Sequence, residues 1–248
     1  RVAEPLSDMG AVIEITDKGT PPVDISGTNK LTSINYSLPV ASAQLKSSLI
    51  LAAMYAKGIS TIKEPVVTRD HTERMMEAFG CGITSNVSGC IKIEGGKDYR
   101  GTRINVPGDI SSAAFFIVAA LICPNSNITI CNVGINPTRI GILNILEKMG
   151  ADIQVINERH DLFEPIADLK VKYSHLKGIK IPENQISLAI DEFPIIFIAA
   201  ACASGVTILR GAEELKVKES DRIESMAEGL ETLGIQTTVY DDGIKIIG

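Results

Sequence analysis

Residues 222–234 read RIESMAEGLETLG, an amphipathic helix with a glycine stop. Ile223, Met226 and Leu230 recur at intervals of three or four residues, as they would on one face of an α-helix. Gly234 follows the last apolar residue, and glycine adopts at little cost the left-handed conformation that ends many helices. The pattern predicts a helix that ends at Gly234 and is followed by a strand.

The same ending occurs at several places in the chain. It is found at Met9-Gly10, Phe79-Gly80, Met149-Gly150 and Leu233-Gly234. The first three glycines are evenly spaced, and the fourth follows after a longer interval. Self-similarity of this kind is typical of a fold built from repeated units.

Each repeat is predicted to contain a short strand, a helix that is apolar nearly all round, a β-branched strand, a turn with an arginine, an amphipathic helix and two closing strands. The apolar helices are expected over 45–56, 112–122 and 193–203, the β-branched strands over 58–63, 127–133 and 205–209, and the arginines are Arg69, Arg139 and Arg222. A helix without a polar face is buried. The predicted fold is therefore α/β (α+β), with repeated βαβαββ units, buried helices and outward-facing sheets.

Composition excludes several classes of protein. The chain has 248 residues, a net charge of −6 and no apolar run long enough to span a membrane, which argues against nucleic acid or a membrane as partner. Its five cysteines form no CxxC pair, so we expect reduced, buried thiols and a cytoplasmic protein, with no metal site. They are Cys81, Cys90, Cys123, Cys131 and Cys202.

Three segments interrupt or bound the repeats. The glycine-rich stretch 95–101 is the expected crossing between two domains. Residues 158–177 are more polar than their counterparts and are expected to form an irregular hairpin or a surface insertion. The chain opens with Arg1, inside a predicted helix over 2–9, so we expect it to be a fragment of a longer protein.

Residues 216–222 read KVKESDR and concentrate charge between a predicted strand and a predicted helix. Ser220 is the expected N-cap of that helix, and Asp221 lies near the positive end of its dipole. A solvated charged loop would have the same composition. The run by itself therefore does not define a site.

Three motifs together resemble one family. They are ASAQLKS at 41–47, TRDHTERM at 68–75 and KESDR at 218–222, with Asp191 ahead of a buried helix. With this order they resemble the EPSP synthases (3-phosphoshikimate 1-carboxyvinyltransferases) over essentially the whole chain. The resemblance implies a two-lobed enolpyruvyl transferase fold that is incomplete here at both ends. Residues 1–103 would be the remainder of one lobe, about one and a half units, and residues 104–248 two units of the other.

The resemblance also implies a reaction. The family transfers the enolpyruvyl group of phosphoenolpyruvate to the 5-hydroxyl of shikimate 3-phosphate in the shikimate pathway, which leads to chorismate and the aromatic amino acids, and is the target of glyphosate. It needs no cofactor and no metal. The full-length protein is expected to be a cytoplasmic monomer with two small-molecule substrates, and the isolated fragment is expected to be inactive.

The family's substrate-binding positions on one side correspond to Ser42, Ala43 and Gln44, which would hold the phosphate of shikimate 3-phosphate, and to Thr68 and Arg69. A helix N-terminus favours an anion through its N–H groups and dipole. The structural alternative for Ser42 is that it acts only as a helix cap. Asp70 with Glu73 would form a capping box, which is compatible with substrate binding by Thr68 and Arg69 because the two pairs of residues differ.

The family's chemistry on the other side corresponds to Asp191, Lys218, Glu219 and Arg222. Asp191 would be the base for the 5-hydroxyl, and Glu219 the proton donor and acceptor at the methylene carbon. Lys218 would bind shikimate 3-phosphate and Arg222 phosphoenolpyruvate. The alternative for Asp191 is an N-cap. Glu192 has no counterpart with a known role, and Arg139 is expected to be structural.

Two other functions stay open at this point. A UDP-N-acetylglucosamine enolpyruvyl transferase would share the fold, although its motifs do not match residues 218–222. A catalytically inert fragment would keep the fold and bind neither substrate. Binding of shikimate 3-phosphate would separate these alternatives from the main reading.

Overall fold

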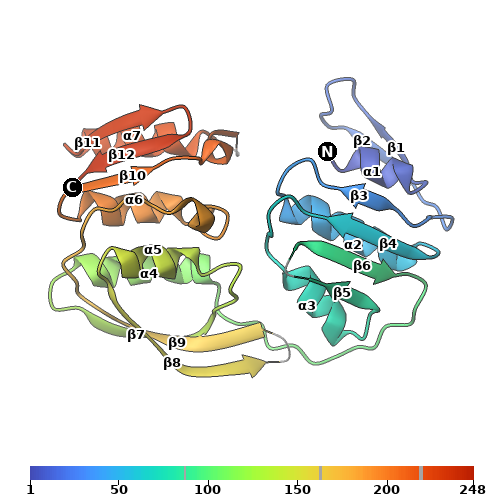
Figure 1. The fold of residues 1–248 in the computed structure, drawn as a ribbon, viewed down its shortest axis with the longest axis horizontal. Helices are drawn as coiled ribbons and strands as arrows, with labels where there is room; N and C mark the ends of the chain where they lie inside the picture. Colours follow the sequence, from blue (N-terminus) through green and yellow to red (C-terminus); the bar gives the residue numbers. More distant parts are fainter. Residues whose placement is uncertain (87, 162–163, 218–219) are drawn as a thin grey trace. The chain divides into compact units, whose positions relative to one another are not determined.

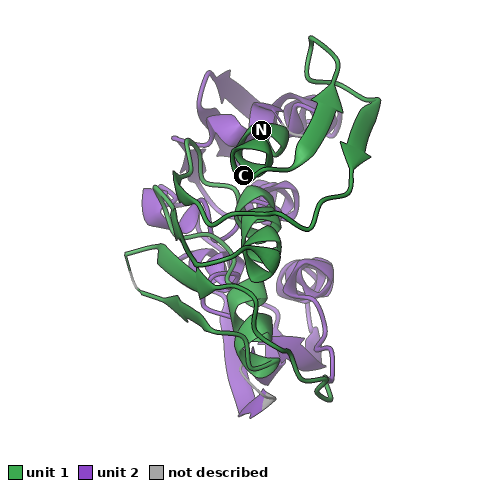
Figure 2. Cartoon of the chain, turned by 90° about the vertical axis from the view of Figure 1, so that its right-hand side faces the viewer, with its two compact units in different colours: residues 1–104 green, residues 105–248 purple. Residues whose placement is uncertain are grey.

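The computed structural model describes residues 1–86, 88–161, 164–217 and 220–248. They form two compact units, Arg1–Ile104 and Asn105–Gly248 (Figure 2). Each unit has a hydrophobic core of its own, because the buried cluster of the first lies between Met9 and Ile93 and that of the second between Ile110 and Ile246.

The first unit contains a four-stranded sheet with the order β3-β4-β6-β5. Strands β3 and β4 are parallel, and the other neighbours are antiparallel. The long helix α2 buries Leu45, Leu49, Ile50 and Ala53 together with the buried isoleucines of β4 and β6. The elements are α1 (Ala3–Asp8), β1 (Val12–Ile15), β2 (Val23–Ser26), β3 (Asn35–Ser37), α2 (Ala43–Tyr55), β4 (Ile59–Lys63), α3 (His71–Ala78), β5 (Ile83–Ser85) and β6 (Cys90–Glu94).

The second unit contains two antiparallel sheets, with the orders β7-β9-β8 and β10-β12-β11. Its first half consists of α4 (Ile110–Ile122), β7 (Asn127–Gly134), α5 (Gly141–Lys148), β8 (Asp152–Asp161) and β9 (Glu164–Lys172). Its second half consists of η1 (Glu183–Gln185), α6 (Phe193–Ala201), β10 (Val206–Leu209), η2 (Glu213–Val217), α7 (Arg222–Thr232), β11 (Gln236–Tyr240) and β12 (Gly243–Ile247). Helices α4, α5 and α6 lie between the two sheets (Figure 1). The predicted arrangement of buried helices and outward-facing sheets is therefore confirmed in this unit.

All four predicted helix stops have the expected backbone. The φ angles are 94° at Gly10, 76° at Gly80, 94° at Gly150 and 84° at Gly234. Because residues with a Cβ rarely adopt such angles, glycine is the residue that allows each chain reversal.

Helices α2 and α4 begin two residues earlier than predicted and expose part of their surface, whereas α6 begins at Phe193 as predicted. Helix α4 begins at Ile110, because the carboxylate of Asp109 accepts hydrogen bonds from the backbone N–H groups of Ser111 and Ser112, at 3.2 and 3.1 Å. It also exposes Phe115 and Phe116, with 59% and 65% of their surface accessible, and α2 exposes Leu51 and Tyr55. The expectation of burial is therefore wrong for α2 and α4.

The glycine-rich stretch 95–101 belongs to the first unit and is not the crossing between the units. The N–H of Gly96 and the hydroxyl of Tyr99 both donate to the carbonyl of Met54, each at 2.9 Å. The N–H of Arg100 donates to the carbonyl of Phe79 at 3.0 Å. These bonds fasten the stretch to the ends of α2 and α3, and the chain leaves the unit only after Ile104.

Residues 158–177 include the end of β8 and all of β9, which pair as an antiparallel hairpin whose register shifts between Ile156 and Arg159. The prediction of an irregular hairpin is confirmed. A surface insertion is wrong for β9, because this strand is the centre of its sheet and buries Leu169 and Val171 completely.

The prediction of buried cysteines is confirmed only in part. All five thiols are free; Cys81 is buried and Cys90 half-buried, whereas Cys123, Cys131 and Cys202 are exposed. Two of the exposed residues are helix C-caps, which lie where the chain returns to the surface. In the described part of the chain, no helix has the length and apolarity needed to cross a membrane.

Candidate functional site

The first group of candidate residues lies at the start of α2. Ser42 has an extended backbone, with φ −145° and ψ 104°, and its Oγ accepts the N–H of Leu45 at 3.3 Å. The cap role of Ser42 is confirmed. Ala43 and Gln44 open the helix, where backbone N–H groups point out of the helix end and suit an anion.

Thr68 and Arg69 lie in the turn between β4 and α3. The Thr68 N–H donates to Glu64 Oε2 at 3.1 Å, and its hydroxyl donates to the same oxygen. Its carbonyl accepts from Lys46 Nζ at 3.4 Å. The turn is therefore held by two residues that the sequence did not point to, Lys46 and Glu64.

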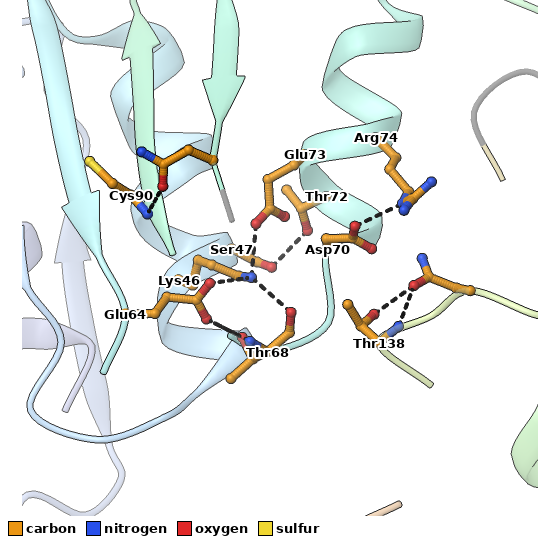
Figure 3. Close-up of polar contacts among 12 residues, drawn as sticks. Lys46, Ser47, Glu64, Thr68, Asp70, Thr72, Glu73, Arg74, Cys90 and Thr138 are labelled. Atoms are coloured by element: carbon orange, nitrogen blue, oxygen red, sulfur yellow. Dashed lines mark hydrogen bonds and ion pairs between the residues drawn. The ribbon is translucent and has the colours of Figure 1, made fainter. Parts of the chain in front are cut away.

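Lys46, Glu64 and Glu73 form a buried ionic cluster, which we call the Lys46 cluster (Figure 3). Lys46 Nζ lies 3.0 Å from Glu64 Oε1 and 2.8 Å from Glu73 Oε1, and the lysine side chain is completely buried. Burial raises the pKa of the Glu73 carboxyl, and the ammonium of Lys46 opposes this shift only in part. The signal in the sequence was Lys46 as the one charged residue of a mostly apolar helix, because a buried ammonium requires carboxylate partners.

The predicted capping box at α3 is wrong. Asp70 occupies the N-cap position, but its side chain makes no capping bond and instead accepts from Arg74 Nε at 2.8 Å. Glu73 turns inward to Lys46 rather than back to the helix start. Glu73 pairs with Lys46 rather than with the backbone of α3, because a buried ammonium needs a carboxylate close to it.

The second group of candidate residues contains an ion pair between Asp191 and Arg222. Arg222 Nη1 lies 3.2 Å from Asp191 Oδ1, and the two side chains are 22% and 30% exposed. Glu192, not Asp191, holds the N-cap position of α6, so the cap interpretation of Asp191 is wrong. The described part of the chain therefore brings Asp191 together with Arg222.

The predicted N-cap at Ser220 is also wrong. Asp221 caps α7, and its Oδ1 accepts the N–H groups of Ile223 and Glu224, each at 3.0 Å. A carboxylate satisfies these donors and also interacts with the helix dipole. Lys218 and Glu219, the other two predicted site residues of this segment, lie outside the described residues.

Glu192 is a second buried carboxylate that the sequence did not single out. Its Oε1 accepts from the hydroxyl of Ser111 and lies 3.3 Å from Arg139 Nη2, and only 2% of its side chain is exposed. Burial raises the pKa of Glu192, and the contacts to Ser111 and Arg139 lower it by a smaller amount. Arg139 thereby ties the starts of α4 and α6 together, which is the structural role predicted for it.

In the part of the chain that the structure describes, no three His, Cys, Asp or Glu side chains lie close enough together to hold a metal ion. The candidate residues are instead hydroxyls, amides, carboxylates and basic side chains. Such groups bind and orient anions and transfer protons.

The sequence model of EPSP synthase (3-phosphoshikimate 1-carboxyvinyltransferase) matches residues 1–248. The 3-phosphoshikimate 1-carboxyvinyltransferase of Legionella pneumophila (strain Paris) is 56% identical over the whole chain, which covers 57% of that relative. The same enzyme of Alkalilimnicola ehrlichii is 56% identical, with 55% of its length covered.

Solved structures agree with these matches. An EPSP synthase structure from Acinetobacter baumannii has a TM-score of 0.89 and 54% identity, covering all of this chain and 56% of the other. The enolpyruvyl transferase NikO from Streptomyces tendae has a TM-score of 0.73 and 16% identity over all of this chain and 57% of the other, which shows the fold alone.

The fold is therefore that of the enolpyruvyl transferases. Within this class, the chain belongs to the EPSP synthase (3-phosphoshikimate 1-carboxyvinyltransferase) family. It spans a little over half the length of the curated relatives it matches, 57% in the Legionella protein.

Proposed function

We propose that the protein carrying this chain transfers the enolpyruvyl group of phosphoenolpyruvate to the 5-hydroxyl of shikimate 3-phosphate and releases phosphate. The observation that carries this proposal is the 56% identity to a 3-phosphoshikimate 1-carboxyvinyltransferase along all 248 residues. It favours shikimate 3-phosphate over UDP-N-acetylglucosamine as the acceptor. The monomeric state and the cytoplasmic location belong to the same proposal.

The phosphate of shikimate 3-phosphate is proposed to bind at the start of α2. Ser42, Ala43 and Gln44 offer backbone N–H groups and polar side chains at the positive end of the helix dipole. Arg69 adds a guanidinium, which binds phosphate through two parallel hydrogen bonds better than an ammonium does. Thr68, beside it, is included in this substrate-binding group.

The chemistry is proposed to occur at Asp191 and Glu219. Asp191 takes the proton of the 5-hydroxyl as its oxygen attacks C2 of phosphoenolpyruvate, while Glu219 protonates the methylene carbon C3. In the second step Glu219 removes a proton from the new methyl group, the enol double bond re-forms, and the C2–O bond to phosphate breaks. Positioned acids and bases of this kind each contribute about 10²–10⁴-fold to a rate.

Arg222 and Lys218 are proposed to bind the anionic substrates, Arg222 phosphoenolpyruvate and Lys218 shikimate 3-phosphate. The ion pair between Arg222 and Asp191 supports the first assignment, because one guanidinium has five N–H donors and can hold Asp191 and a substrate anion together. Such a bridge would keep the base next to the enol that is attacked.

The test is steady-state turnover of the full-length protein carrying this chain. Asp191→Ala and Glu219→Gln are expected to lower kcat by about 10²-fold or more with the fold intact. Glu213→Gln, which removes an exposed carboxylate of the same unit, is the control and is expected to leave kcat unchanged. Near-normal turnover of both site variants would contradict the assigned roles.

Binding separates the remaining alternatives. Titration of shikimate 3-phosphate into the folded protein, with and without phosphoenolpyruvate, is expected to give saturable binding. Binding of UDP-N-acetylglucosamine instead would support the other transferase, and binding of neither ligand would support a protein that keeps the fold without the activity.

A further inference from the structure

Glu64 uses its two carboxylate oxygens for different partners. It follows β4 directly and is buried. Its Oε1 accepts from Lys46 Nζ at 3.0 Å, whereas its Oε2 accepts both the N–H, at 3.1 Å, and the hydroxyl of Thr68 (Figure 3). One side chain thus joins the long helix α2 to the turn that precedes α3.

Every polar group of Thr68 is engaged by the Lys46–Glu64 pair. Glu64 accepts from its N–H and its hydroxyl, and Lys46 donates to its carbonyl at 3.4 Å. A hydroxyl has a single hydrogen, so a Thr68 hydroxyl that donates to Glu64 cannot donate to a substrate anion. Direct donation to the phosphate then falls to the next residue, Arg69.

Burial of three charged side chains is an unfavourable way to stabilise a fold. Replacing such groups with well-packed apolar residues is often neutral or stabilising, so stability alone does not explain the arrangement. A second link supports a positioning role, because Ser47 of α2 and Thr72 of α3 join their hydroxyls at 2.7 Å beside the cluster. This bond joins α2 to α3, the helix that the turn precedes.

We propose that Glu64, held by Lys46, is a positioning residue that fixes the Thr68–Arg69 turn so that Arg69 meets the phosphate of shikimate 3-phosphate. This inference rests on the proposed function. It changes the role of Thr68 from a direct substrate ligand to the link through which Glu64 acts.

The test compares two chemically identical substitutions in the full-length protein. In Glu64→Gln, the amide nitrogen cannot accept a hydrogen bond, so either orientation of the amide loses Lys46 or Thr68. In Glu73→Gln, the amide oxygen can keep the bond to Lys46, and Glu73 Oε2 has no hydrogen-bond partner in the described part of the chain that would be lost. Glu73 makes no described contact with Thr68, which makes it the matched control.

The Kd and KM of shikimate 3-phosphate are expected to rise about 10- to 100-fold in Glu64→Gln, with kcat within about threefold, as for a displaced binding group. Both constants are expected to stay within about twofold in Glu73→Gln. Equal effects of the two substitutions, or an unchanged Kd in Glu64→Gln, would overturn the proposal. If Glu64→Gln does not fold, Glu64→Asp replaces it, because the shorter side chain keeps the charge but cannot reach both partners.

A double-mutant cycle with Arg69→Ala tests whether Glu64 influences the affinity for shikimate 3-phosphate through Arg69. If Glu64 acts through Arg69, Glu64→Gln adds no further loss of affinity in the Arg69→Ala background. Losses that add would overturn the proposal. A folded unsubstituted protein that does not bind shikimate 3-phosphate would instead show that the proposed function has failed.

Discussion

Asp191 and Glu192 are neighbouring carboxylates in very different surroundings. Asp191 is partly exposed and faces Arg222, whereas Glu192 is buried against Ser111 and Arg139. A group that exchanges protons with a substrate must be accessible, and a buried carboxylate with its own hydrogen-bond donors is not. Environment rather than residue type therefore supports Asp191 as the base and gives Glu192 a structural role.

The buried carboxyl of Glu192 should make the free energy of unfolding depend on pH. Burial raises its pKa above the ordinary value of 4.5, so its contribution to stability is fully present below that value and is lost as the pH rises through the raised pKa. Glu192→Gln does not titrate. Urea unfolding at a series of pH values should therefore show the variant gaining free energy of unfolding relative to the parent as the pH rises above 4.5.

Asp109 provides the control of opposite sign. Although burial opposes the shift, hydrogen bonds from Ser111 and Ser112 lower the pKa of Asp109 below 3.8. Its contribution to stability is present above that pH and is lost as the pH falls through the lowered pKa. Asp109→Asn should thus lose stability relative to the parent as the pH rises through this window, and an identical trend in both variants would contradict the assigned cause.

At the scale of elements, the Lys46 cluster joins α2 to the end of β4 and to α3. Lys46→Met would leave Glu64 and Glu73 buried without their cation. We expect a loss of about 3–5 kcal/mol in the free energy of unfolding. Lys97→Met, which removes one partner of an exposed pair with Glu94, should cost less than about 1 kcal/mol, and an equal cost of the two would contradict the role of burial.

Gly95, which directly follows β6, packs closely against the end of α2. A Cβ at this position would lie 2.1 Å from the carbonyl oxygen of Ala56 and 2.3 Å from that of Ala53, so Gly95→Ala must displace backbone. We expect thermal unfolding to show a loss of about 1–3 kcal/mol. Gly101→Ala is the control, because nothing lies within 4 Å of its added Cβ; equal stability of the two variants would contradict the close approach.

At the scale of the whole molecule, the two units have separate hydrophobic cores. Leu49 is completely buried in the first, and Leu49→Ala should cost about 2–5 kcal/mol there. Amide hydrogen exchange should then quicken in β4 and β6 while β9 and β12 keep their protection. The converse variant, Phe197→Ala, should affect only the second unit, and loss of protection in both units from either change would show that they unfold as one.

The sequence alone determined the features that depend on a few neighbouring residues. The glycine stops and the existence of the apolar helices were predicted correctly, because a φ angle or a helical period is set by local sterics and spacing. Which residues of α2 and α4 are exposed was not predicted. The family motifs identified the fold and the candidate residues. The choice of helix-capping residue was less predictable. Asp221 rather than Ser220 caps α7, and Glu73 pairs with Lys46 instead of forming a capping box.

Only the tertiary structure decided which charges meet. Lys46 with Glu64, Arg139 with Glu192, and Arg222 with Asp191 are pairs from distant parts of the chain. No periodicity brings them together. The physical reason is that a buried charge is stable only beside a partner of opposite charge. Which residue becomes that partner depends on how the elements pack, and neither segment by itself determines it.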